Sequence, residues 1–168
     1  IPDPRNSPVS AVAVVFSKPI STPSFGLEDL TLTRDGVGNL ITDAVSIVSL
    51  DPTSFRIEGL LDLTVNDGQY ELTVSGTGVQ DIDGNTGIGS RTARWTMDST
   101  APILTGITHL ATNPRNIVVQ SLNVTFSEPI DAGTFDWHDI TLTRNSGANL
   151  ITNAVTVEHI SDTEYRIR

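Results

Sequence analysis

The stretch VAVVFSKPI at residues 12–20 decides the fold, because it returns as LNVTFSEPI at residues 122–130. Positions 12, 14 and 16 are apolar in both copies. The positions between them change from Ala13 and Val15 to Asn123 and Thr125. This alternation with a period of two is typical of a β-strand that buries only one face. Each stretch therefore predicts a half-buried strand, with Phe16 and Phe126 as equivalent core residues.

The repetition extends far beyond this stretch. Residues 5–58 align with residues 115–168 without a gap, and 23 of the 54 positions are identical. The segment TLTR occurs at residues 31–34 and again at 141–144, and NLIT occurs at 39–42 and 149–152. An internal match of this length indicates two copies of one structural unit.

The remaining segments also favour strands over helices. Leu30 and Leu32, and their counterparts Ile140 and Leu142, alternate with threonines, so a strand is expected in each copy. No segment has a helical period, and β-branched residues are abundant. Further strands are expected at residues 44–50, 54–57, 69–75 and 91–97, with turn signals at 35–36, 66–68, 83–85 and 146–147. About seven short strands per 100 residues predict an all-β fold, a β-sandwich with Greek-key connections.

A polar segment that ends in proline separates the two copies. Residues 98–102, DSTAP, follow a predicted strand, and proline cannot continue a strand ladder. We therefore predict a first repeat at residues 1–98, a linker at 99–102 and a second repeat at 103–168. The phase of the repeat predicts that the first copy lacks its first strand. It also predicts that the second copy lacks about 40 C-terminal residues, as expected for part of a longer polypeptide.

The composition narrows the classes of function. The net charge is −10, which disfavours binding to a polyanion, so nucleic acid is not an expected partner. The chain has no cysteine, which excludes disulfides and thiolate chemistry. No apolar run reaches the roughly 18 residues that a membrane span needs. With 38% hydrophobic and 18% charged residues, the composition is that of a globular protein.

The candidate metal ligands are Asp81, Asp83 and Asn85, in the sequence DIDGN. Oxygen ligands at alternate positions are how many calcium loops begin, because Ca²⁺ takes six to eight oxygens. The alternative is a tight turn, in which Asp and Asn side chains accept hydrogen bonds from nearby backbone N–H groups and a glycine takes positive φ. The tight turn is the favoured interpretation, with calcium as the alternative and no cofactor required.

Other candidate chemistry is sparse. The three histidines, His109, His138 and His159, are scattered through the second copy, and no nucleophile motif accompanies them. We therefore do not expect an enzyme. A second arrangement for calcium would bring Glu128, Asp131, Asp136 and Asp139 of the second repeat together beside Asp98.

The motifs together resemble those of the bacterial immunoglobulin-like repeats. They are, in order, VxFSxPI, FxxxD(L/I)TLT, GQYELTV, DIDGN and DSTAP. The resemblance implies tandem immunoglobulin-like β-sandwiches in a cell-surface or extracellular protein. It implies a structural spacer or stalk, whose partners are neighbouring repeats of the same polypeptide or other copies in an assembly. The alternative is an adhesive module that recognises a glycan or surface protein through its pole loops, where Trp137 and Phe135 are the aromatic residues.

Overall fold

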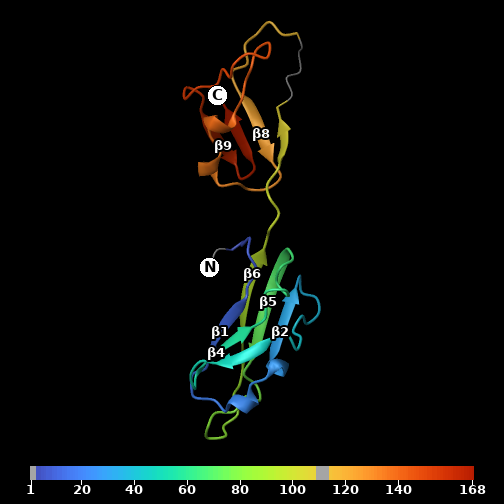
Figure 1. Ribbon diagram of the computed structural model, residues 1–168, viewed down its shortest axis with the longest axis vertical. Coiled ribbons are helices and arrows are strands. Elements are labelled where there is room, and N and C mark those ends of the chain that lie inside the picture. Colours follow the sequence, from blue (N-terminus) through green and yellow to red (C-terminus); the bar gives the residue numbers. More distant parts are fainter. Residues whose placement is uncertain (1–2, 109–113) are drawn as a thin grey trace. The chain divides into compact units, whose positions relative to one another are not determined.

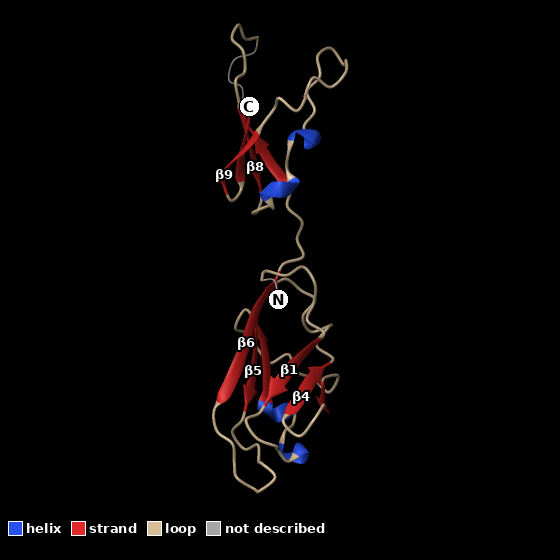
Figure 2. Ribbon diagram, turned by 90° about the vertical axis from the view of Figure 1, so that its left-hand side faces the viewer, coloured by secondary structure: helices blue, strands red, loops and turns tan. Residues whose placement is uncertain are grey.

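The alternating segments form strands, and the chain is all-β. The computed structural model describes residues 3–108 and 114–168, and these hold three small antiparallel sheets, four short 3₁₀ helices and no α-helix (Figures 1 and 2). The chain divides into two compact units, Ile1–Thr100 and Ala101–Arg168, here called unit 1 and unit 2. The division falls inside the predicted linker.

Unit 1 contains two three-stranded sheets. One has the order β1-β4-β3 and the other β2-β5-β6, and neighbouring strands are antiparallel. Two 3₁₀ helices, Thr22–Ser24 and Leu27–Asp29, connect the first sheet to the second. The strands are β1 (Ala11–Val15), β2 (Leu30–Arg34), β3 (Ser46–Ser49), β4 (Ser54–Glu58), β5 (Gly68–Ser75) and β6 (Ser90–Met97).

Both sheets of unit 1 contribute to one hydrophobic core. Phe55 and Ile57 of β4 have no exposed surface, and Leu32 of β2 has none either. Leu72 of β5 is 1% exposed, and Tyr70 on the same strand stacks on Trp95 of β6 with ring centroids 5.4 Å apart. In β2, β4 and β5 alternate residues therefore face this core, as the alternation predicts.

Unit 2 contains one four-stranded sheet with the order β7-β8-β10-β9. Its inner strands β8 and β10 match β1 and β4 of unit 1, and β9 matches β3. The additional strand β7 pairs with the edge of β8 that is left open on β1 in unit 1. The strands are β7 (Leu104–Ile107), β8 (Leu122–Phe126), β9 (Val157–Ser161) and β10 (Glu164–Ile167), and the 3₁₀ helices are Ala132–Thr134 and Trp137–Asp139.

The repeat in sequence is also a repeat in hydrogen bonding. The Asn39 carboxamide oxygen accepts from the N–H of Leu32 at 3.0 Å, and the Asn149 oxygen accepts from the N–H of Leu142 at 3.0 Å. The other end of each carboxamide donates to a carbonyl, from Asn39 to Leu30 and from Asn149 to Ile140, at 3.2 Å in both. The identical NLIT segments thus make the same local structure in both units.

The prediction of a strand at residues 140–144 is wrong, because these residues do not form one. Its counterpart β2 in unit 1 is a strand because it pairs along its whole length with β5. Residues 140–144 have no strand pairing, and no described strand of unit 2 corresponds to β5. Leu142 is consequently 55% exposed, whereas Leu32 is fully buried. The alternating pattern was present, but a strand also needs a neighbour to satisfy its backbone groups.

Each unit is centred on three aromatic rings. Phe16, Phe25 and Phe55 make edge-to-face contacts with centroid distances of 5.1, 5.5 and 5.8 Å. In unit 2, Phe126, Phe135 and Tyr165 repeat this arrangement at 5.3, 5.6 and 5.8 Å. Phe16 and Phe126 are equivalent, as expected, but both are partly rather than fully buried. Phe55, which lies opposite Val14 in the β1–β4 ladder, is the ring with no exposed surface.

Phe55→Ala should destabilise unit 1 by about 3–5 kcal/mol, because it removes a fully buried ring and leaves a cavity between two others. Phe16→Ala should cost less, since Phe16 is partly exposed already. Val15→Ala, at a side chain that is 73% exposed, is the matched control and should change stability by less than about 0.5 kcal/mol. Urea unfolding followed by Trp95 fluorescence measures all three. Equal losses for Phe55 and Val15 would contradict the placement of the core.

Candidate functional site

Asp81 forms the centre of the loop that the sequence singled out. Its Oδ1 accepts hydrogen bonds from the backbone N–H of Asp83 at 3.0 Å and of Asn85 at 2.8 Å. The Asn85 carboxamide nitrogen donates to both oxygens of the same carboxylate, at 3.1 and 2.9 Å. The turn is closed by the backbone, since the Gly84 N–H donates to the Asp81 carbonyl and Gly84 takes a φ of 84°. These contacts are those of the tight turn.

The Asp81 carboxylate is largely buried, and hydrogen-bond donors and a lysine stabilise its charge. The residue is only 8% exposed, and Lys18 Nζ lies 3.5 Å from its Oδ2. The hydrogen bonds from the Asn85 side chain and backbone lower the pKa of Asp81, with smaller contributions from Asp83 and Lys18. The lowered pKa favours the ionised carboxylate. Backbone hydrogen bonds hold the loop against the Pro19–Ser21 segment, since the Ile82 N–H donates to the Pro19 carbonyl and the Ser21 N–H donates to the Gln80 carbonyl.

The structure does not bring the three predicted ligands together as an oxygen cage. Asn85 presents its nitrogen to Asp81, and the Asp83 side chain is exposed on the outer side of the turn. Calcium would require these donors to turn away from Asp81 and several further oxygens to converge. Calcium at this loop therefore stays a prediction, with the tight turn as the interpretation that the contacts favour.

Acidic residues of the second candidate calcium site, in unit 2, also accept hydrogen bonds from the backbone. Asp131 accepts from the N–H of Gly133 at 2.9 Å, and Asp139 accepts from the N–H of Asp136 at 3.0 Å. Asp136 accepts from the His138 N–H and also lies 2.7 Å from the His138 ring nitrogen, contacts that lower the pKa of Asp136. These carboxylates cap the two 3₁₀ helices that precede residues 140–144.

The histidines form no metal cluster in the part of the chain that the structure describes. That part holds no group of three or more His, Asp or Glu side chains able to hold a metal ion. His138 stacks on Trp137 with ring centroids 3.7 Å apart, and His159 contacts the edge of Tyr165. His109 lies outside the described residues.

A long-range anchor that sequence reasoning missed lies at the other end of unit 1. Asp67 Oδ1 accepts from the N–H and hydroxyl of Ser99, both at 2.7 Å, and Oδ2 accepts from the Thr100 hydroxyl at 2.8 Å. The Ser99 side-chain and backbone donors, followed by Thr100, lower the pKa of Asp67. Two residues of the predicted linker 99–102 are therefore held against the β4–β5 connection of unit 1.

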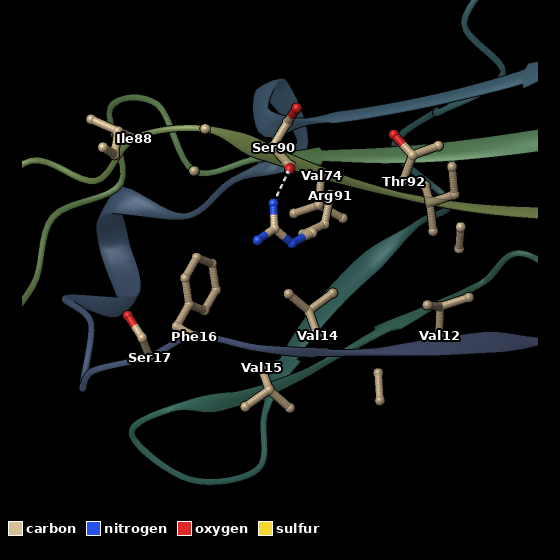
Figure 3. A pocket seen from close by; sticks show the side chains of 15 residues that line it. Val12, Val14, Val15, Phe16, Ser17, Val74, Ile88, Ser90, Arg91 and Thr92 are labelled. Carbon is tan, nitrogen blue, oxygen red and sulfur yellow. Dashed lines mark hydrogen bonds between the residues drawn. The ribbon is translucent and has the colours of Figure 1, made fainter.

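Unit 1 has a lateral cleft of about 430 Å³ beside the open edge of β1 (Figure 3). Val12, Val14 and Phe16 line one side, and Val74 and Arg91 line the other. Arg91 donates to the carbonyl of its neighbour Ser90 at 3.0 Å. The lining is mostly aliphatic, so this cleft suits an apolar segment rather than a polar reactant.

Comparison with protein-family models, with curated proteins and with solved structures found no match to this chain. In the described ranges, no helix combines the length and the apolar character that crossing a membrane demands.

Chelation should leave the melting temperature of unit 1 unchanged, because N–H donors of the turn already occupy the oxygens of the Asp81 carboxylate. Asp81→Ala should lower the melting temperature, whereas Asp83→Ala, at an exposed side chain in the same loop, is the matched control and should have little effect. The measurement is thermal unfolding with and without a calcium chelator. If calcium binds, a chelator lowers the melting temperature and Asp83→Ala abolishes that response.

Unit 1 should lose stability in acid through Asp67 and Asp81. The pKa of each is below the ordinary value of 3.8 in the folded state, so each contributes stability that is complete above 3.8. That contribution is lost as the pH falls through the lower folded-state pKa. Asp67→Asn should flatten the dependence of unfolding free energy on pH in this acidic range, as measured by urea unfolding. An unchanged slope would contradict the anchoring role of Asp67.

Proposed function

We propose that this chain is a pair of tandem immunoglobulin-like β-sandwich repeats that act as a structural spacer or stalk. They would belong to a large bacterial cell-surface or extracellular protein, and their partners are neighbouring repeats or other copies in an assembly. The observation that carries the proposal is that the two units repeat the same three-ring cluster and the same Asn-centred hydrogen bonds. Repetition of a whole unit is how extended proteins gain length.

The strands of the two units, taken together, support an immunoglobulin-like sandwich as the repeating unit. Unit 2 has a four-stranded sheet, three strands of which match the β1-β4-β3 sheet of unit 1. The second sheet of unit 1, β2-β5-β6, shares its hydrophobic core with the first. A repeat composed of a four-stranded sheet like that of unit 2 and a three-stranded sheet like β2-β5-β6 would have the division of immunoglobulin constant-type domains. This supports the sandwich, which remains part of the proposal.

The polar loop groups also support a structural role. Four aspartates accept hydrogen bonds from backbone N–H groups and, in some cases, from nearby hydroxyl or carboxamide donors. They therefore hold loops in fixed conformations, and they are Asp67, Asp81, Asp131 and Asp139. A net charge of −10 keeps such repeats in solution and away from nucleic acid. These features fit a rigid extracellular spacer that needs no cofactor.

The second candidate function is adhesion through the loops of unit 2. The observation that favours it is the stack of Trp137 on His138, because the His138 ring is exposed and Trp137 is partly exposed. Aromatic rings at a surface provide platforms for sugar rings and apolar side chains. Phe135 does not belong to this platform, since it packs in the three-ring cluster. In unit 1 the counterparts of Trp137 and His138 are Leu27 and Glu28.

A binding screen against surface glycans and surface proteins separates the two functions. For a spacer we expect no saturable binding of any ligand in isothermal titration calorimetry, whose signal does not depend on Trp137. The matched variant is Trp137→Leu, which places the unit 1 residue at this position and keeps an apolar contact. It should leave the thermal unfolding of unit 2 nearly unchanged. Saturable binding that Trp137→Leu abolishes would favour the adhesive module over the spacer.

A further inference from the structure

Unit 2 presents an open apolar groove. Its volume is about 630 Å³, and its lining includes Leu104, Ile107, Phe126, Phe135 and Ile140. Leu104 is 50% exposed and Ile107 is 59% exposed. Among the described residues of unit 2, Val124 and Tyr165 are the buried apolar side chains, at 3% and 1%. The inner face of the unit 2 sheet is therefore largely uncovered, which is unfavourable for so many apolar groups.

Unit 1 shows what covers the equivalent face. There β5 lies antiparallel to β2, with Leu30 opposite Val74, Leu32 opposite Leu72 and Arg34 opposite Tyr70. Tyr70 and Leu72 are each 1% exposed, so β5 places alternate apolar side chains in the core. Strand β6 then pairs with the other edge of β5. The repeat aligns β2 with residues 140–144, of which Ile140 and Thr141 line the groove.

Residues 140–144 already have the backbone arrangement that a partner strand needs. The Leu142 N–H is taken by Asn149, as the Leu32 N–H is by Asn39. Successive N–H groups of an extended chain point to opposite edges, so those of Thr141 and Thr143 point to the edge where β5 would lie. Asn145 has a φ of 52°, close to the 54° of its counterpart Asp35. The Asp35 carboxylate accepts a hydrogen bond from the N–H of Gln69 in β5.

We propose that this groove binds a β5-type strand of the repeat's own sequence, antiparallel to residues 140–144. The occupant is an extended segment with apolar side chains at alternate positions, followed by a second strand of the β6 type. Its alternate residues would lie opposite Ile140, Leu142 and Arg144, in the register of unit 1. A second copy of this chain is the weaker occupant, because its own β5 is already paired on both edges.

The test adds this strand pair to the full chain. Residue 58 aligns with residue 168, so a copy of residues 59–98 joined after Arg168 continues the repeat in phase. The amide hydrogens of Thr141 and Thr143 should then exchange more slowly by about 100-fold, since they become part of a strand ladder. The Thr31 and Thr33 amides of unit 1 serve as the internal reference in the same sample. NMR-detected hydrogen exchange measures all four.

Two substitutions in the extended chain make the result specific. Leu142→Asp should remove the protection of Thr143, because it places a charge where the added strand packs. Thr141→Asp is the matched control and should retain the protection, because the counterpart Thr31 is exposed beside β5. Neither substitution alters unit 1, so loss of protection at Thr31 and Thr33 as well would indicate that the whole chain has unfolded.

Three outcomes would overturn the proposal. The first is unprotected Thr141 and Thr143 in the extended chain while Thr31 and Thr33 remain protected. The second is equal protection with a copy of residues 59–98 in which Tyr70, Leu72 and Val74 are replaced by serine. The third is a dimer of the original 168-residue chain in which Thr141 and Thr143 are protected, which would make a second copy the occupant.

Discussion

The edge-to-face contact of three aromatic rings is the constraint on which both units depend. In unit 1 the rings come from the end of β1, the segment between the two 3₁₀ helices and β4, so their contact joins three separate parts of the chain. A ring pair contributes energy beyond its buried area only in a narrow range of geometries. The cluster therefore fixes where the 3₁₀ segment crosses from one sheet to the next. That crossing in turn sets the position of β2.

The two units differ in how much of this arrangement is covered. In unit 1 the second sheet closes over the rings, and Phe55 has no contact with solvent. In unit 2, Phe126 and Phe135 line an open groove, and Phe135 is partly exposed whereas its counterpart Phe25 is buried. Among the described residues, only unit 2 has a strand of the β7 type, and only unit 1 has strands of the β2, β5 and β6 types. The two units can therefore be compared directly at three matched pairs of strands, β1 with β8, β3 with β9 and β4 with β10.

Local alternation predicted most strands but not whether each had a neighbour. Residues 12–16 and 122–126 show the expected pattern and pair as strands. Residues 140–144 have an equally good pattern and do not, because pairing depends on distant residues. The loop at Asp81 shows a related limit, since the same oxygens serve a turn or an ion. The Asp67 anchor joins positions 32 apart, a contact that no local motif specifies.

The hydrogen bonds of Asn39 and Asn149 have a consequence for the order of folding. Each joins Leu32 or its counterpart Leu142 to a residue only seven positions further along the chain. Contacts over such short separations close quickly, whereas the pairing of Leu32 with Leu72 must wait for a much longer loop. As the polypeptide leaves the ribosome, the outer edge of this strand is therefore satisfied first. The first half of each repeat can therefore adopt the conformation that pairs with the β5-type strand while the second half is still being synthesised.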